Sequence, residues 1–168
     1  MESRDAGRFV RYFENVRGRT DRVVACVPPD RLEWSPAKGA FTFGDVIRHI
    51  AATERYMFAE NVQGHPSRYP GHGRELADGY EAVLVYWRRL HQEAVAIFSA
   101  LTPDRLVGRC TTPGGAEMTV WKWLRAMVEH EVHHRGQLYL MLRVLGVETP
   151  PLYGLTSEEV QRRSVGPR

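Results

Sequence analysis

Residues 76–101, with the sequence LADGYEAVLVYWRRLHQEAVAIFSAL, carry the most regular hydrophobic pattern in the chain. Apolar side chains recur there at alternating spacings of four and three residues, at Leu76, Tyr80, Val83, Trp87, Leu90, Ala94, Ile97 and Leu101. This alternation places all of them on one stripe of an α-helix. A seam this strict is typical of near-parallel packing against other helices. The segment therefore predicts one member of a four-helix bundle in an all-α fold.

Two further helices are expected before this segment. Residues 9–27 show the same alternation of apolar side chains, and two consecutive prolines end it. The second helix begins after Thr42, a capping residue, and ends near residues 61–64. Residues 28–41 show no periodicity, so they predict an ordered crossover loop whose Trp34 packs on the bundle.

The connections on either side of residues 76–101 differ in length. Residues 64–73 hold three glycines and two prolines, which predicts a loop long enough to cross the length of the bundle. Thr102-Pro103 begins a second connection, which runs through the sequence TTPGG at residues 111–115. No internal repeat is present.

The last long helix is expected to start at a Thr119 cap and to run to about Leu145. Gly146 stands where a left-handed C-terminal cap is needed. A capping box from Thr156 to Glu159 predicts a short extra helix near the C-terminus.

The 168 residues fit one domain, spanning residues 1–168. The chain is 43% hydrophobic and 26% charged, which excludes disordered and fibrous proteins. No apolar run approaches the roughly 18 residues of a membrane span. The N-terminus lacks the apolar stretch of a secretory signal, so we expect a cytoplasmic location. Cys26 and Cys110 are far apart without CxxC spacing, so both are predicted to be reduced and structural.

The net charge of +3 gives little support for a nucleic-acid partner. Of the 23 basic residues only Lys38 and Lys122 are lysines, and genome composition alone can produce such an arginine bias. The arginines near the N-terminus are interrupted by acidic residues, as on a solvated helix face. We expect a small-molecule substrate and neither a nucleic-acid nor a membrane partner.

The last long helix carries the candidate chemistry. Spacings of three and four residues put two histidines into one face, which consists of Val120, Trp123, Met127, His130, His134, Gln137, Met141 and Val144. His130 and His134 lie roughly 40° apart around the helix axis, so both imidazoles can converge on one ion. If the two histidines were buried without a metal, their ring nitrogens would need other hydrogen-bond partners. Each buried donor left without a partner would cost about 1–3 kcal/mol. The pair therefore predicts metal coordination, whereas His133 falls on a more polar stripe and is expected to face solvent or an interface.

The same stretch also matches H-E-x-x-H, in which two histidines bind zinc and the glutamate is the general base. Gln137 and Leu140 stand where the extended metalloprotease motif needs glycine and histidine. The chain also lacks the β-sheet half of such an enzyme. We interpret the match as coincidental and expect Glu131 to form an i,i+4 pair with Arg135.

A third ligand has to come from another segment. His49 is the one histidine elsewhere that lies on a predicted helix beside a core stripe. His65 and His72 fall in a predicted loop, and His91 lies at the edge of its helix. Three neutral imidazoles would leave coordination positions open, as in catalytic rather than structural zinc sites.

Two blocks of the sequence resemble the DinB/YfiT-like family. They are LEWSPAKGAFTFGDVIRH at residues 32–49, and residues 119–146 with the pattern His130-x-x-x-His134-Arg-Gly-Gln137. The resemblance covers nearly the whole chain, including the TTPGG loop. It implies an up-down-down-up four-helix bundle and frequently a homodimer. It also implies that His49, His130 and His134 hold a divalent metal, often zinc or nickel.

The family resemblance does not fix the reaction, because its members include thiol S-transferases, isomerases of thiol adducts and putative hydrolases. Our first hypothesis is a metal-dependent S-transferase of the bacillithiol or mycothiol type, acting in detoxification or stress response. A metal lowers the pKa of a bound low-molecular-weight thiol and so generates the nucleophile. Gln137 is expected to orient a ligand, and Arg135 and Glu131 to support the site from outside the ligand shell.

Two alternatives stay open. The first is a metal-dependent hydrolase that uses a metal-bound hydroxide, with Glu131 or a water relay as the base. The second is a non-catalytic metal- or ligand-binding stress protein. Gly136, inside a predicted helix, costs roughly 0.5–1 kcal/mol against alanine, which suggests that another backbone comes close to it.

Overall fold

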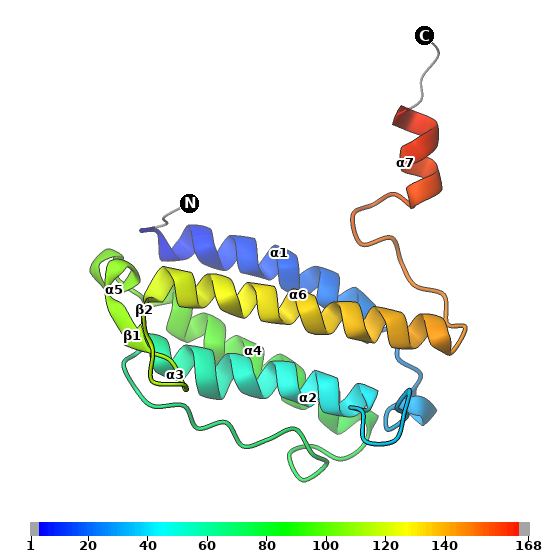
Figure 1. The fold of residues 1–168 in the computed structure, drawn as a ribbon, viewed down its shortest axis with the longest axis horizontal. Helices are drawn as coiled ribbons and strands as arrows, with labels where there is room; N and C mark the ends of the chain where they lie inside the picture. The colour runs from blue at the N-terminus through cyan, green and yellow to red at the C-terminus, as the bar shows by residue number, and fades with distance from the viewer. Residues whose placement is uncertain (1–3, 165–168) are drawn as a thin grey trace.

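The computed structural model describes residues 4–164, and these residues are mostly helical with one small two-stranded sheet. Four helical segments lie side by side (Figure 1). In space α1 contacts α4 and α6, and α2 contacts the same two helices. The bounds are α1 Ala6–Val24, α2 Phe43–Thr53, α3 Ala59–Val62, α4 Tyr80–Ser99 and α6 Val120–Val144. In Figure 1, α1 and α6 run in one direction along the bundle, and α2 and α4 run in the other.

The first two helices begin at side-chain caps. The Asp5 carboxylate accepts a hydrogen bond from the backbone N–H of Arg8, 2.9 Å away. Thr42 and Asp45 form a reciprocal capping box at the start of α2, so the predicted Thr42 cap is confirmed. Trp34 packs against Phe43 with ring centroids 5.7 Å apart, which confirms its predicted contact with the bundle.

The second helix is not a continuous α-helix as predicted. A π-helical turn, Glu54–Phe58, separates α2 from α3. A π turn contains one residue more than an α turn. Its first residue, Glu54, lies in the interior, where only 2% of its surface is exposed. The hydrophobic spacing alone does not reveal this extra residue.

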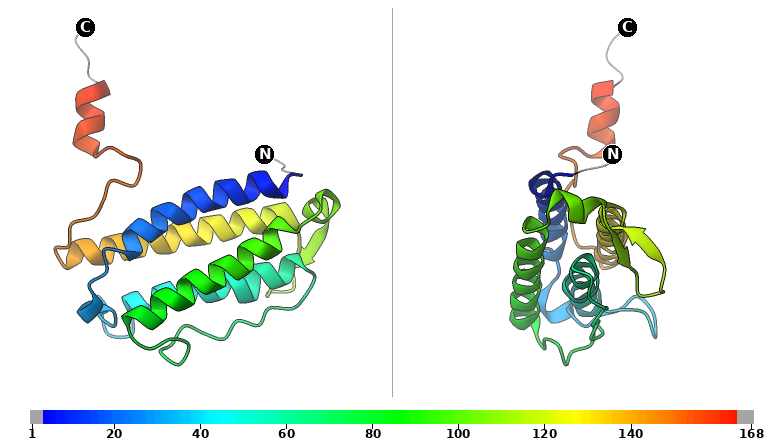
Figure 2. Two further views of the ribbon diagram at one scale, coloured as in Figure 1. Left: turned by 180° about the vertical axis from the view of Figure 1, so that it is seen from behind. Right: turned by 90° about the vertical axis from the view of Figure 1, so that its left-hand side faces the viewer.

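The α4 helix begins at Tyr80, so Leu76 lies in the preceding loop and not on the helix as predicted. Gly79 stands at the N-cap with φ of 86°, a left-handed conformation that other residues rarely adopt. This conformation separates the helix from the loop. The loop runs along the bundle, as expected (Figure 2).

The connection between α4 and α6 contains structure that was not predicted. It consists of a short helix, α5 Pro103–Val107, and an antiparallel pair of strands, β1 Arg109–Thr111 and β2 Glu117–Thr119. Cys110 lies opposite Met118 at the middle position of the two paired strands. Thr119 occupies the N-cap position of α6 as predicted, but its side chain makes no capping hydrogen bond, because this residue belongs to β2.

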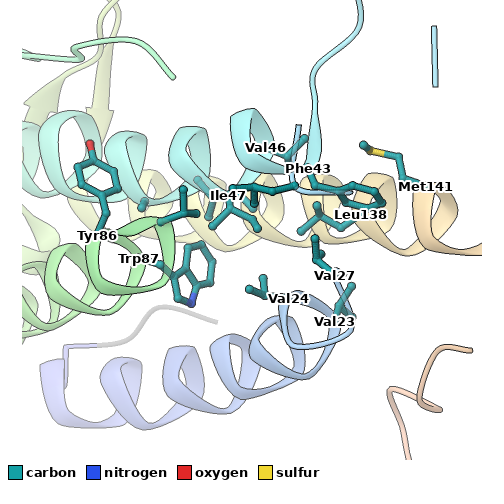
Figure 3. Close-up of a cluster of buried hydrophobic side chains, with 14 of the residues drawn as sticks. Val23, Val24, Val27, Phe43, Val46, Ile47, Tyr86, Trp87, Leu138 and Met141 are labelled. Atoms are coloured by element: carbon teal, nitrogen blue, oxygen red, sulfur yellow. The ribbon is translucent and has the colours of Figure 1, made fainter. Parts of the chain in front are cut away.

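The hydrophobic core consists of two clusters, one in each half of the bundle. The first surrounds Phe43, Ile47 and Trp87 and includes Leu138 of α6 (Figure 3). The second includes Phe13, Phe98 and Leu124, together with other side chains from α1, α3, α4 and α6. Phe13, Phe43, Ile47, Leu138 and Phe98 are all completely buried.

Charged side chains are buried where these clusters meet. Arg17 lies over the rings of Phe13 and Trp87, one from each cluster, and it pairs with Glu54 and with Glu131 Oε2, the latter at 3.3 Å. Arg17 and both carboxylates are each only 2% exposed. One guanidinium thus lies between two carboxylates in the interior, which offsets part of the cost of burying these charges.

The buried face of α6 is wider than the predicted one, of which Val120, Met127, His134 and Met141 are buried. It includes Leu124, Val128, Glu131, Arg135, Leu138 and Leu142. Of the predicted face, Gln137 is exposed and Val144 is 61% exposed. Glu131 and Arg135 occupy positions that hydrophobicity alone would assign to solvent, but Arg17 pairs with Glu131 there and the Val16 carbonyl accepts from Arg135.

The C-terminal segment leaves the bundle after α6. Gly146 adopts φ of 73° and confirms the predicted left-handed cap. An extended arm follows, and Arg22 donates a hydrogen bond to the Leu152 carbonyl. Helix α7, Ser157–Ser164, begins at the predicted Thr156–Glu159 capping box and stands clear of the bundle (Figures 1 and 2). Within residues 4–164, no helix combines the length and apolar character needed to cross a membrane.

Candidate metal centre

Three histidines from two helices meet at the candidate centre. His49 comes from α2, and His130 and His134 come from consecutive turns of α6. The Nε2 atom of His130 lies 3.1 Å from His49 Nε2 and 3.1 Å from His134 Nε2. One ring nitrogen of each histidine lies within 4.8 Å of the others, so the three can hold one metal ion. The structure thus brings together the three histidines predicted as ligands.

The opposite ring nitrogens of two of these histidines are held by hydrogen bonds. Gln137 Oε1 lies 2.7 Å from His134 Nδ1, and Tyr69 Oη lies 2.7 Å from His49 Nδ1. An amide oxygen accepts only, so His134 carries its proton on Nδ1 and directs the lone pair of Nε2 toward the centre. Such outer hydrogen bonds fix the tautomer and orientation of metal-binding histidines.

The environment keeps these imidazoles neutral at neutral pH. Burial, and then the nearby His134 and His72, lower the pKa of His49 to about 4. Burial, and then His134 and His49, lower the pKa of His130 to about 3. Burial also lowers the pKa of His134, against the opposing hydrogen bond from Gln137. Neutral imidazole is the form that coordinates a metal.

The donor set fits a divalent transition metal. Nitrogen–zinc distances are about 2.0–2.1 Å, so one ion can contact two nitrogens that lie 3.1 Å apart. Without an ion, His130 Nε2 can donate its single proton to only one of the two neighbouring nitrogens. Three histidines and no carboxylate favour zinc, nickel, copper or iron over magnesium or calcium, which prefer oxygen ligands. Three protein ligands leave at least one coordination position for another molecule.

Aromatic side chains surround the histidines. Phe41 contacts the ring of His49 edge-on at 5.6 Å, and Phe58 lies 5.8 Å from the ring of His130. Tyr69 Oη also lies 3.1 Å from His72 Nδ1, so a hydrogen-bonded chain leads from His49 through Tyr69 to His72. His133 is exposed as predicted, and its ring lies 5.0 Å from that of His134.

The expected position of Glu131 is wrong. Its carboxylate accepts a hydrogen bond from Thr20 Oγ1 at 2.6 Å and pairs with Arg17, on the side of α6 that faces α1. Burial raises the pKa of Glu131, although Arg17 acts against this rise. The expected pair with Arg135 is replaced, because Arg135 donates to the Val16 carbonyl at 3.2 Å. Both residues are therefore structural neighbours of α1 and do not contact the histidines.

The other histidines have separate partners. His91 is partly buried at the edge of α4, as predicted, with Nδ1 2.8 Å from the buried Glu54 and Nε2 3.4 Å from the exposed Glu14. His65 faces Glu60, as expected for a loop residue away from the centre. The Gly136 prediction is also corrected within the described chain, since no atom lies within 4 Å of the place that a Cβ would occupy.

The sequence reasoning missed Tyr69, Phe41 and the role of His72. All three lie outside regular helices, where periodicity gives no information about direction. The predicted length of the loop at residues 64–73 could have indicated these contacts, because a segment that crosses the bundle has to pass over the helix that carries His49. A tyrosine and a histidine in that loop were therefore candidates for contacts with the centre.

Comparison with known proteins identifies relatives along nearly the full length of the chain. The model of the DinB family matches residues 1–166. An uncharacterized protein of Bacillus subtilis, YjoA, is 24% identical over 151 residues, which cover 88% of this chain and 96% of YjoA. A second uncharacterized protein of the same organism, YrdA, is 22% identical over 161 residues, or 90% of this chain and 89% of YrdA.

Solved structures show the same fold. The crystal structure of YjoA, described as a DinB-like protein, superposes with a TM-score of 0.71 at 23% identity and covers 86% of this chain and 97% of YjoA. A DinB-like protein from Bacillus cereus also gives a TM-score of 0.71, at 20% identity, and covers 85% of this chain and 94% of that protein. These similarities support the predicted family and fold class.

Proposed function

Because the chain belongs to the DinB family, we propose that it is a divalent-metal-dependent enzyme, and specifically a thiol S-transferase. His49, His130 and His134 hold the ion, and zinc or nickel are the first candidates. The observation that carries the proposal is the convergence of three neutral Nε2 atoms with no carboxylate among them. A low-molecular-weight thiol is the proposed co-substrate and an electrophilic small molecule the acceptor, as in detoxification.

A divalent ion bound by neutral ligands lowers the pKa of a thiol or a water molecule that takes an open position beside it. The histidines contribute no negative charge, so the positive charge of the site remains available to an anionic nucleophile. Gln137 holds His134 in the required tautomer, and Tyr69 orients the ring of His49 through its Nδ1. Phe41 and Phe58 supply apolar surface beside the rings and reduce the access of water.

The chain's own acid, base and thiol groups favour a transferase over a hydrolase that uses Glu131. The Glu131 carboxylate is occupied by Thr20 and Arg17 and is 98% removed from solvent. Of the two thiols of the chain, Cys26 Sγ donates to the Arg22 carbonyl, and burial raises the pKa of Cys110. The attacking sulfur is therefore proposed to come from the thiol co-substrate.

The test combines metal analysis with activity measurements. The purified protein and its His134→Ala variant are analysed for metal, and each is assayed with a panel of low-molecular-weight thiols and a chromogenic electrophile. We expect about one metal equivalent per chain and thiol-dependent turnover, both lost in His134→Ala. His133→Ala is the matched control, because its exposed ring stands outside the triad, and it retains the metal.

Each other outcome selects a different function. Thiol-independent turnover of an ester or amide that needs the metal would indicate a hydrolase. Metal without turnover in the whole panel would favour a non-catalytic metal-binding protein. Turnover that persists after the metal is removed would refute the proposal.

A further inference from the structure

We propose that a cavity between α1, α5 and α6 binds an amphipathic monocarboxylate with a medium-length apolar chain, such as a medium-chain fatty acid. The chain of the ligand fills the apolar cavity, and its carboxylate lies between Arg8 and Arg125 at the rim. The inference goes beyond the metal-dependent activity and does not rest on it. The packing of the bundle leaves this cavity open, and the charges around it specify the ligand.

The cavity lies at the end of the bundle where α1 and α6 begin, next to α5 (Figure 1). Its volume is about 290 Å³, near the lower end of the range for small-molecule sites. Leu106, Leu124 and Val128 form its floor, and each is at most 4% exposed. All three belong to the second core cluster. An apolar chain in this cavity therefore rests on the packed core and is removed from water.

Aromatic rings form the walls of the cavity. Phe9 and Tyr12 come from α1, and Trp121 comes from the first turn of α6. The ring of Phe9 is held in place, because it stacks on Phe13 with centroids 6.0 Å apart and contacts Phe98 edge-on at 5.9 Å. Tyr12 is 54% exposed although it lines an apolar site, so a ligand can cover its ring. Walls that are already in place lower the cost of ordering the site when a ligand binds.

The charged residues that line the cavity are both arginines, Arg8 and Arg125, and both are exposed. Within residues 4–164, the Arg8 guanidinium has no carboxylate partner. Arg125 Nε lies 3.3 Å from Glu129 Oε1, but these side chains are 63% and 68% exposed, so the pair contributes little. A planar guanidinium can donate two parallel hydrogen bonds to a carboxylate. Two cations beside an apolar cavity therefore favour a ligand with an anionic head and an apolar chain.

The cavity is separate from the candidate metal centre. Arg125 precedes His134 by nine residues, and at about 100° per residue the two side chains lie on opposite sides of α6. Arg125 and Val128 line the cavity beside α1 and α5, whereas His130 and His134 meet His49 of α2. Binding in the cavity therefore requires neither a metal ion nor its ligands.

The experiment is isothermal titration calorimetry of the full chain with octanoate and, separately, with octan-1-ol, which has the same chain length without the charge. We expect one octanoate per chain and weaker binding of octan-1-ol. Arg8→Gln and Arg125→Gln each weaken octanoate binding roughly 3–10-fold, because each removes a charge-assisted contact at the rim. Neither variant changes the binding of octan-1-ol, which has no carboxylate for the arginines to hold.

Control variants separate this site from other modes of binding. Arg11→Gln and Arg143→Gln remove the same charge from exposed positions of the same two helices outside the cavity, and they leave octanoate binding unchanged. Val128→Phe fills the cavity and abolishes the binding of both ligands. Tyr12→Ala changes an exposed residue of the wall and weakens the binding of both. Far-ultraviolet circular dichroism checks that every variant remains helical.

The His134→Ala variant distinguishes the cavity from the metal centre. It is expected to bind octanoate as the wild-type protein does, because the cavity lies on the other side of α6. Loss of binding in this variant would place the carboxylate at the metal centre and overturn the proposal. Equal affinities for octanoate and octan-1-ol, or equal losses in the Arg11 and Arg143 variants, would also overturn it. The same holds if the wild-type protein does not bind octanoate at millimolar concentrations.

Discussion

Replacing Arg17 by methionine tests whether the buried charges at the centre of the bundle stabilise one another. The side chain is 2% exposed and pairs with Glu54 and Glu131, each also 2% exposed. Methionine fills much of the same volume beside Trp87, so the change removes charge rather than bulk. It leaves two carboxylates in the interior without their shared cation.

The expected loss follows from this geometry. Breaking a buried ion pair from one side costs about 3–5 kcal/mol, because the remaining charge stays desolvated. Thr20 still donates to Glu131 and His91 still lies beside Glu54, so the loss is limited to about that of one pair. A domain of this kind is stabilised by roughly 5–15 kcal/mol in total. Arg17→Met is therefore expected to remove a large share of the free energy of unfolding.

Urea unfolding followed by circular dichroism at pH 7 measures the effect. With a slope of about 1–3 kcal/mol per molar urea, the midpoint falls by roughly 2 M. Arg11→Met, an exposed change on the same helix, shifts stability by less than about 0.5 kcal/mol. Adding Glu131→Gln to Arg17→Met removes one uncompensated charge and recovers part of the loss.

The pH dependence gives a second measurement of the same effect. Burial raises the pKa of Glu131 in the folded protein above that of the unfolded chain. The folded state then binds more protons than the unfolded state, so its relative stability increases as the pH falls. The deficit of Arg17→Met is therefore smaller at pH 5 than at pH 7. A deficit below about 1 kcal/mol at pH 7 would refute the reasoning that these charges are desolvated and mutually dependent.

Three further predictions concern the metal centre and the backbone. Gln137→Leu removes the acceptor for His134 Nδ1 and weakens metal binding about 10–100-fold in a chelator competition, without loss of helix content. In the metal-free protein, the pKa values of His49 and His130 are lower in the folded state than in the unfolded chain. As the pH falls from about 6.5 toward 4, the unfolded chain therefore binds more protons, and stability to urea decreases. His130→Gln weakens this pH dependence. Gly79→Ala, at φ of 86°, destabilises the fold by about 1–2 kcal/mol in thermal unfolding. Gly18→Ala, in an exposed turn of α1 with free space around it, has the opposite sign.

Helix periodicity predicted those features of the fold and the site that depend only on residue spacing within one helix. The i,i+4 pair His130 and His134 and the family resemblance that adds His49 agree with the observed convergence of ring nitrogens. The sequence also predicted the helix caps, namely Thr42 at the start of α2 and Gly146 after the end of α6. These features are local, so a short window of sequence contains the information that determines them.

Features that depend on partners from distant segments could not be predicted from the sequence. Glu131 and Arg135 were predicted to pair with each other beside the site, yet Arg17 and the Val16 carbonyl are their partners inside the core. Tyr69 reaches His49 from a loop whose path no periodicity records. In each case the missing information is a contact across the bundle.

The π-helical turn Glu54–Phe58 also affects which changes in chain length the protein can accept. The turn accommodates one extra residue, so deleting one residue there would restore a regular α-helix and keep the following residues in place. A regular α-helix has no such slack, and deleting one residue between His49 and the turn would rotate everything after it by about 100°. Phe58 and Val62, both buried, would then turn out of the core, while His49 upstream would keep its place. Insertions and deletions between residues 64 and 79 carry no such penalty, because a loop absorbs the change in length. Length variation is therefore expected in the loop and, by a single residue, at the π turn, and it is strongly disfavoured in the regular α-helix directly after His49.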